Sequence, residues 1–272
     1  MTDKENLELF FEKYCGEDVA VAFSGGADSA LVLYYALKAA KTKGKKVYAA
    51  LIKTTLHPAN EAMEAKKLAE DMGAEFIEIR VDEFANAGIE NNPKDRCYLC
   101  KRYMFSTLKQ RMLELGVKTV FEGTNIDDTK VYRPGIKAIK ELNIISPLWA
   151  CNIDKSTVRK ELSDIGISVA DKPSAPCLAT RFPYDTKLTE ENLRRVDKAE
   201  AFLKELGVKN VRVRVHEDLA RIEVDREDEE RILGGRELII KEFTDLGYEY
   251  VTYDLCGFKS GSMDKKILRQ GE

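Results

Sequence analysis

The sequence contains no apolar run long enough to span a membrane, and its first residues lack the positive charge and apolar segment of a signal peptide. It also lacks an excess of basic charge, because 44 Lys and Arg residues face 47 Asp and Glu residues and the formal net charge is -3. Both signs are interspersed, which argues against a dominant nucleic-acid-binding surface. We therefore expect a cytoplasmic protein whose partners include neither a membrane nor a nucleic acid.

The stretch from Val19 to Leu37 predicts a buried parallel strand, a tight turn and a helix. An apolar run rich in Val and Ala stops at Ser-Gly-Gly, residues 24–26, and the chain continues as an apolar helical segment. The glycines let the backbone approach a bulky anion, and the N–H groups at the helix start favour a phosphate, with the Ser24 and Ser29 hydroxyls as further donors. Asp28 suits a helix cap or a magnesium ligand. The alternative is that Ser-Gly-Gly only turns the strand into the helix.

Strands and helices alternate along the first part of the chain. Strands are predicted at 46–52, 75–81 and 119–121, with helices at about 60–72 and 98–115. This order predicts an α/β fold with a doubly wound parallel sheet. Ligands of such folds bind outside the carboxyl ends of the strands. The Ser-Gly-Gly turn and the polar stretch 122–128 are therefore expected at one edge, although a capped turn also explains that stretch.

A second, smaller α+β domain is predicted after a loop with three prolines, residues 172–183. Its elements are a helix that stops at Gly207, a hairpin of strands 211–216 and 219–224, a charged helix at about 227–246 and a strand at 250–253. We expect domain bounds of 1–171 and 172–272.

Cysteine and histidine are arranged in a way that restricts the possible metal sites. Six cysteines in a cytosolic chain are not expected to form a disulfide framework. Cys97 and Cys100 form a Cys-x-x-Cys, which fits buried thiols at a helix start, a zinc site or a redox pair. A zinc site would need a second close pair of ligands, which the chain does not offer, since His57 and His216 are its only histidines. Three thiolates could hold an iron–sulfur cluster if Cys177 folds back over the same sheet edge.

Residues 24–29, Ser-Gly-Gly-Ala-Asp-Ser, resemble the SGGxDS pyrophosphate loop of the ATP pyrophosphatases, the PP-loop superfamily. That resemblance implies cleavage of ATP between its α and β phosphates, with transfer of AMP to a substrate oxygen. Further motifs lie, in order, at 92–101, 122–128, 132–135, 176–181, 212–214, 220–224 and 257–263. Together with the loop, they make nearly the whole chain similar to the LarE family of ATP-dependent sulfur transferases.

The family resemblance implies insertion of sulfur into the carboxylates of pyridinium-3,5-biscarboxylic acid mononucleotide, a step toward a nickel-pincer cofactor. The carboxylate is adenylated, and a sulfur nucleophile then displaces AMP. Members with only the cysteine that matches Cys177 sacrifice its sulfur and end as dehydroalanine. Members that also carry the Cys-x-x-Cys resemble a class with a 4Fe-4S cluster, whose open iron would carry a hydrosulfide. Because this chain has all three cysteines, we expect the cluster, an external sulfide source and a homo-oligomer.

The candidate site residues follow from the motifs and the resemblance. ATP and Mg²⁺ are expected at Ser24, Gly25, Gly26, Asp28, Ser29, Gly123, Thr124 and Asp127. The expected ligands of the 4Fe-4S cluster are Cys97, Cys100 and Cys177, and the expected catalytic residues are Cys177, Asp28 and Arg181.

Four further residues are candidates for substrate binding. Arg212 and Arg214 share one face of a strand, where two guanidinium groups can bind phosphate or carboxylates. Without the family match, the solvated face of a half-buried hairpin is an equally good interpretation. Glu200 and Glu223 could orient a metal or substrate, with surface-helix and strand-pair roles as alternatives.

Some residues depart from the family pattern or match no motif. Thr180 stands where Ser is frequent and keeps the hydroxyl, Asp185 stands where Gly is common, and Cys256 stands where Glu is expected. Cys15 and Cys151 are expected to be small core residues.

One alternative mechanism is sacrificial transfer of sulfur from Cys177, with Cys97 and Cys100 only structural. Three other functions share some of these features. Thiolation of tRNA uses the same loop, but the chain shows no RNA-binding domain or concentrated basic surface. An ammonia-using synthetase such as NAD synthetase has no use for the three cysteines. An ATP-binding metal or cluster carrier would be a non-enzymatic alternative.

Overall fold

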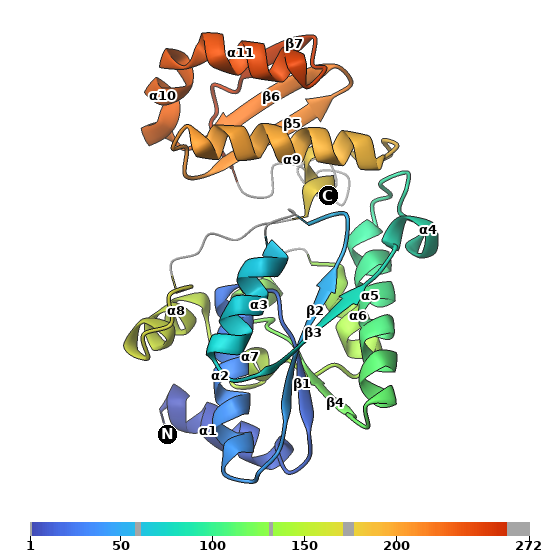
Figure 1. Cartoon of the computed structure of the whole chain (residues 1–272), viewed down its shortest axis with the longest axis vertical. Helices are drawn as coiled ribbons and strands as arrows, with labels where there is room; N and C mark the ends of the chain where they lie inside the picture. Colours follow the sequence, from blue (N-terminus) through green and yellow to red (C-terminus); the bar gives the residue numbers. More distant parts are fainter. Residues whose placement is uncertain (1, 58–60, 131–132, 171–176, 260–272) are drawn as a thin grey trace. The chain divides into compact units, whose positions relative to one another are not determined.

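The computed structural model describes residues 2–57, 61–130, 133–170 and 177–259, which divide into two compact units (Figure 1). Residues 1–89 and 95–174 form the first unit, and residues 90–94 and 175–272 form the second. The domain boundary predicted between 171 and 172, and the prolines predicted to form a linker at 173 and 176, lie outside the described residues.

The segment 90–94 joins the second unit although its chain neighbours belong to the first. Asn92 is fully buried, and its Nδ2 donates to the carbonyl oxygens of Phe182, at 3.2 Å, and Pro183, at 2.6 Å. Its own carbonyl accepts from the backbone N–H of Asp185, which has φ 62°. This conformation favours glycine, which is the residue that the family resemblance leads us to expect at position 185.

The first unit is built on a four-stranded parallel sheet with the order β3-β2-β1-β4. The strands are β1 (Val19–Ala22), β2 (Val47–Lys53), β3 (Glu75–Arg80) and β4 (Thr119–Phe121). Val19 pairs with Val47 on one side and with Thr119 on the other. The chain order therefore reverses at β1, which is the position where doubly wound folds bind ligands.

Helices cover both faces of this sheet (Figure 1). Val19 and Val21 pack into one core with helices α1, α2, α3, α7 and α8, whereas Ala20 packs into another with α5 and α6. The predicted doubly wound sheet is therefore confirmed. The helices of this unit are α1 (Asp3–Tyr14), α2 (Ala27–Lys41), α3 (Glu61–Asp71), α4 (Glu83–Ala87), α5 (Arg96–Glu114), the 3-10 turn η1 (Asp127–Lys130), α6 (Gly135–Glu141), α7 (Pro147–Ala150) and α8 (Lys155–Asp164).

The second unit has a three-stranded sheet with the order β5-β6-β7. The strands β5 (Val211–His216) and β6 (Leu219–Val224) are antiparallel and have the predicted bounds, and β7 (Tyr250–Tyr253) lies parallel to β6. The helical elements are η2 (Leu178–Arg181), α9 (Glu190–Glu205), η3 (Arg226–Asp228), α10 (Glu229–Gly234) and α11 (Arg236–Asp245).

The single charged helix predicted at 227–246 is wrong, because the helix breaks at Gly235. Two consecutive glycines, Gly234 and Gly235, lower the helix propensity there. A Cβ at Gly235 would lie 3.1 Å from the carbonyl oxygen of Arg231, so a side chain at the junction between α10 and α11 would be tightly packed. Among the helices of the described ranges, none is both long and apolar enough to cross a bilayer.

Candidate functional site

The loop after β1 has the shape of an anion-binding turn. Gly25 has φ +70°, and a Cβ there would lie 3.0 Å from both Cα and Cβ of Ala65 in α3. Both the backbone conformation and the close approach therefore need glycine. Gly26 is the N-cap residue of α2 and Asp28 lies in the first helical turn, so the helix-cap alternative for Asp28 is wrong.

The predicted serine hydroxyls converge at this loop. The Oγ atoms of Ser24 and Ser29 are 3.3 Å apart, and Ser29 Oγ donates to the carbonyl oxygen of Gly26 at 3.0 Å. The loop thus combines hydroxyl groups with the amino-terminal end of α2, where a helix favours negative charge.

The stretch after β4 packs directly on the loop, as predicted for two segments at one sheet edge. A Cβ at Gly123 would lie 3.0 Å from Asp28 Cβ and from the backbone nitrogen of Ser29. Asn125 links the two segments, because its Nδ2 donates to Asp28 Oδ1 at 3.1 Å and its Oδ1 accepts from the backbone N–H of Asp127 at 3.0 Å. Asn125 lies in the polar stretch 122–128 predicted at this edge, but it is not among the predicted site residues.

Glu122 is a buried carboxylate that holds the same segment. It accepts hydrogen bonds from the Thr124 backbone N–H at 3.0 Å, from Thr124 Oγ1 at 2.8 Å and from Ser146 Oγ. The hydroxyl of Thr124 is therefore engaged by the protein itself. A role for Thr124 in ATP binding stays a prediction.

Asp28 faces a cation that the motifs did not indicate. Its Oδ2 contacts Nζ of Lys155, the first residue of α8. The backbone N–H of Lys155 donates to Asp127 Oδ2 at 3.0 Å, while Asp127 Oδ1 lies 2.8 Å from Nζ of Lys130. The hydrogen bond from Lys130, followed by that from the Lys155 backbone, lowers the pKa of Asp127. No sequence signal marks Lys155, because it is 127 residues from Asp28 and belongs to no motif.

The acidic side chains at this edge suit a magnesium ion bound together with phosphates. Besides Asp28, the half-buried Asp128 accepts from the Asn125 backbone N–H at 3.3 Å and pairs with Arg133 at 2.8 Å. Burial raises the pKa of Asp128 despite that arginine. Mg²⁺ typically uses one or two carboxylates plus phosphate oxygens, so Asp28 and Asp128 are candidate ligands for such an ion.

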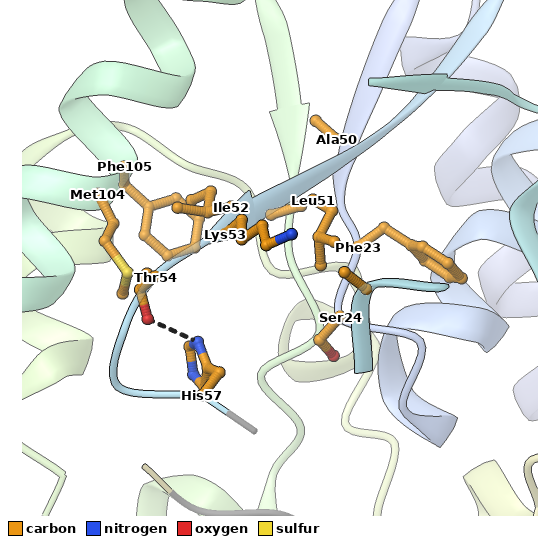
Figure 2. A pocket seen from close by; sticks show the side chains of 12 residues that line it. Phe23, Ser24, Ala50, Leu51, Ile52, Lys53, Thr54, His57, Met104 and Phe105 are labelled. Atoms are coloured by element: carbon orange, nitrogen blue, oxygen red, sulfur yellow. Dashed lines mark hydrogen bonds between the residues drawn. The ribbon is translucent and has the colours of Figure 1, made fainter. Parts of the chain in front are cut away.

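An apolar pocket of about 170 Å³ lies at the carboxyl ends of β1 and β2 (Figure 2). Met104 and Phe105 of α5 lie at one end of it, and Phe23 and Ser24 lie at the other. A polar pair stands at its rim, where Thr54 Oγ1 and His57 Nδ1 are 3.0 Å apart and burial lowers the pKa of His57. Apolar walls with few polar groups fit a flat nucleobase. The full lining is Ala22, Phe23, Ser24, Ala50, Leu51, Ile52, Lys53, Thr54, His57, Ala62, Met104 and Phe105.

In the second unit, Arg181 and Glu200 form a buried bidentate pair. Arg181 Nε donates to Glu200 Oε1 at 2.8 Å and Nη2 donates to Oε2 at 2.7 Å. Glu200 Oε1 also accepts from the Val213 backbone N–H at 2.9 Å, which ties α9 to β5. The surface-helix alternative for Glu200 is therefore wrong.

The arginines of β5 are buried as well, so the solvated-hairpin alternative is wrong. Arg214 donates through Nε to Glu223 Oε2 at 3.0 Å and through Nη1 to the Thr180 carbonyl at 2.8 Å. Arg212 donates to the Val211 carbonyl at 2.6 Å. Burial, followed by the charge of Arg181, lowers the pKa of Arg212 to about 10.

The strand-pair alternative for Glu223 is confirmed. Glu223 lies opposite Arg212 in the β5–β6 register, and its carboxylate bonds the arginine side chains at 214 and 221.

The turn at Cys177 is held by its own backbone carbonyl. That oxygen accepts from Thr180 N at 3.0 Å, Thr180 Oγ1 at 2.8 Å and Arg181 Nη1 at 3.2 Å. The side chain of Cys177 itself is half-buried. The hydroxyl kept by Thr180 is thus part of the turn that positions the cysteine.

The predicted cluster cysteines are divided between the two units. Cys97 is exposed and Cys100 is buried in the first two turns of α5, in the first unit, whereas Cys177 belongs to the second. Within the described part of each unit taken alone, no group of three His, Cys, Asp or Glu side chains is arranged to hold a metal. Cys15 is fully buried in the core of the first unit and Cys151 packs against it, as predicted.

Comparison with known proteins agrees with these features. Residues 1–130 match the PP-loop domain family. A pyridinium-3,5-bisthiocarboxylic acid mononucleotide synthase of Lactiplantibacillus plantarum is 35% identical over 251 residues, which cover 92% of this chain and 90% of the relative. An uncharacterized protein of Synechocystis is 37% identical over 97% of this chain and 98% of the relative. An uncharacterized protein of Methanocaldococcus jannaschii is 31% identical over 94% of this chain and 96% of the relative.

The loop geometry and the full-length similarity lead to one assignment. The loop after β1 supplies the glycines, hydroxyls and helix start that an ATP pyrophosphatase needs at the phosphates. The similarity extends through both units, beyond the PP-loop domain alone. The chain therefore belongs to the LarE family of PP-loop enzymes and is an ATP-dependent sulfurtransferase.

Proposed function

We propose that this enzyme adenylates a carboxylate of pyridinium-3,5-biscarboxylic acid mononucleotide and replaces its oxygen with sulfur. The observation that carries the proposal is the 35% identity, over 92% of the chain, to a relative named as the synthase of the corresponding bisthiocarboxylic acid. The PP-loop supports the ATP-dependent half of the reaction.

Adenylation is the step that the first unit supports. A carboxylate oxygen attacks the α-phosphorus of ATP, and the bond from that phosphorus to the bridging oxygen breaks as pyrophosphate leaves with the electron pair. Ser24, Ser29 and the start of α2 would bind the phosphates, and Asp28 with Asp128 would hold Mg²⁺, which supplies positive charge to them. The apolar pocket beside Ser24 would take the adenine.

The buried arginines of the second unit support binding of the anionic mononucleotide. Arg181, Arg212 and Arg214 are buried near Glu200 and Glu223. Burial, followed by the charge of Arg181, lowers the pKa of Arg212. A phosphate or carboxylate of the substrate would add a negative charge beside these guanidinium groups.

For the sulfur source we propose a 4Fe-4S cluster held by Cys97, Cys100 and Cys177. The donor set fits the group, because cysteine thiolates are the usual ligands of such clusters. When bound, the cluster would supply a hydrosulfide nucleophile that an external sulfide source replenishes. This proposal extends to a cytoplasmic homo-oligomer, in which the second unit contributes subunit contacts.

Anaerobic purification followed by iron and acid-labile sulfide analysis tests the cluster. We expect about four irons per chain in the wild type, with loss in each of Cys97→Ala, Cys100→Ala and Cys177→Ala. Cys256→Ala is the matched control, since Cys256 is also exposed but belongs to no proposed ligand set. Full iron occupancy in Cys177→Ala would contradict the proposal. Absence of iron, with loss of sulfur mass at Cys177 after turnover, would show sacrificial transfer instead.

The adenylation step has its own test. Release of pyrophosphate from ATP should depend on the biscarboxylate mononucleotide. Pyrophosphate release without any carboxylate substrate, or none with it, would contradict the proposed function whatever the iron content.

A further inference from the structure

We propose that Lys155 is the cation that binds the β- and γ-phosphates of ATP at the loop after β1. The proposal rests on the proposed adenylation at this loop and adds a residue to it. Among residues 24–29 there is no Lys or Arg, so the loop itself offers only neutral donors to a group that carries several negative charges.

Lys155 is placed at the loop by tertiary contacts. Its Nζ contacts Asp28 Oδ2, and Asp28 is adjacent to Ser29, whose hydroxyl lies 3.3 Å from that of Ser24. The side chains of Lys155 and Asp28 remain 34% and 24% exposed. The ammonium group is therefore at the proposed phosphate site and is accessible to a ligand.

The backbone of Lys155 is fixed, and its long side chain is partly exposed and ends in an ammonium group that contacts Asp28. Its N–H donates to Asp127 Oδ2 at 3.0 Å, and the preceding residue, Asp154, caps α8 through a 2.7 Å bond to the Thr157 N–H. Asn125 fixes the acidic partner through its bond to Asp28 Oδ1. A four-carbon side chain on a fixed backbone can exchange one anion for another nearby with little rearrangement.

Adenylation develops negative charge on the leaving pyrophosphate, and a lysine beside the phosphates would stabilise that charge together with Mg²⁺. As the carboxylate oxygen bonds to the α-phosphorus and the bond to the bridging oxygen breaks, the electron pair moves onto pyrophosphate. Lys155 would leave Asp28 and donate hydrogen bonds to the β- and γ-phosphate oxygens, where this charge develops. It remains protonated throughout, so no proton acceptor is needed.

Lys130 provides a matched control in the same segment. It also forms an ion pair with an aspartate of this edge, Asp127, at 2.8 Å, but its side chain is 65% exposed. Both lysines can be removed without opening a cavity in the core, so their variants should differ in phosphate binding and not in folding.

The test compares Lys155→Ala, Lys155→Arg and Lys130→Ala with the wild type. Isothermal titration would measure affinity for AMP and for an ATP analogue with a methylene bridge between the α- and β-phosphates. We expect Lys155→Ala to bind AMP as the wild type does, to bind the ATP analogue about tenfold or more weakly, and to release pyrophosphate about 100-fold more slowly. Lys155→Arg should recover part of both losses, and Lys130→Ala should match the wild type.

Two results would overturn the role of Lys155. One is equal behaviour of Lys155→Ala and Lys130→Ala, and the other is an equal loss of AMP and ATP-analogue affinity in Lys155→Ala. If the wild type released no pyrophosphate with the carboxylate substrate, the proposed function would fail, yet the two affinities would still decide the role of Lys155.

Discussion

Arg181 and Glu200 bind each other through two parallel hydrogen bonds, 2.8 and 2.7 Å long, with side chains only 3% and 4% exposed. Arg181 lies four residues after the proposed sulfur-site cysteine, and Glu200 lies on α9. The pair therefore connects the turn at Cys177 to the helix that packs on β5. A buried charge that loses its partner is costly, which makes this pair a structural requirement for the site.

Replacing Glu200 by Ala should strongly destabilise the protein. Arg181 would remain buried without its carboxylate, and the Val213 N–H would lose its acceptor. We expect a loss of about 3–5 kcal/mol in unfolding free energy, measured by urea denaturation and circular dichroism. Glu200→Gln should lose less, because it keeps an acceptor for Val213.

Glu190→Ala is the control for this measurement. Glu190 lies on the same helix and pairs with Arg194 at 2.9 Å, but both side chains are exposed. We expect a change of less than about 0.5 kcal/mol. Equal effects of the Glu190 and Glu200 variants would contradict the importance of the buried pair.

Gly25→Ala should impair ATP binding. The substitution places an L side chain at φ +70° and a Cβ 3.0 Å from Ala65, so the loop must move away from α3. The backbone strain alone is about 1–2 kcal/mol, and we expect a roughly tenfold weaker affinity for an ATP analogue by isothermal titration.

Gly44→Ala is the control that introduces backbone strain without a close contact to a neighbouring residue. Gly44 has φ +62°, but a Cβ there would have no atom within 4 Å. It should show a similar loss of thermal stability with unchanged nucleotide affinity. If Gly25→Ala also retained full affinity, the shape of the loop would not depend on its contact with Ala65.

Glu122→Ala should disorganise the segment that packs on the ATP loop. Without the carboxylate, the Thr124 N–H and the hydroxyl of Ser146 would be buried without their acceptor. Each buried donor left unsatisfied costs about 1–3 kcal/mol, so we expect a clear drop in melting temperature by calorimetry. Glu114→Ala, which removes only an exposed pair with Arg111, should leave that temperature almost unchanged.

Cys15 should resist alkylation, whereas Cys256 should react. Burial raises the pKa of the Cys15 thiol from 9.0 to about 11, and the side chain is fully buried, while Cys256 is exposed. Mass spectrometry after iodoacetamide treatment at pH 8 would detect the difference. Labelling of Cys15 at the rate of Cys256 would contradict its placement in the core.

The same shift predicts how Cys15 affects stability at high pH. The folded state holds the thiol proton of Cys15 more tightly than the unfolded state does. The contribution of Cys15 to the free energy of unfolding is therefore fully present below pH 9 and is lost as the pH rises through about 11. A Cys15→Ala variant should show a smaller loss of unfolding free energy over that interval.

Local sequence determined the elements that carry the chemistry. The apolar run before Gly25, and the alternation along residues 211–216 and 219–224, predict strands because each pattern follows from burial of one or both strand faces. The parallel sheet order then places the ATP loop and the segment 122–128 at one edge. The sequence pattern does not predict the break at Gly235, because the charged helical pattern continues on both sides of two weak helix formers.

Only the tertiary structure decided which side chains meet. Lys155 reaches Asp28, and Asn92 joins the second unit, through contacts between segments far apart in the chain. The burial of Arg212, Arg214 and Glu200 likewise depends on packing around β5, which a period of two along the strand does not reveal. By itself the sequence determined the strands of both sheets and the family, because these depend on local patterns. Charge pairing depends on three-dimensional proximity, so the structure alone identified a lysine at the proposed phosphate site.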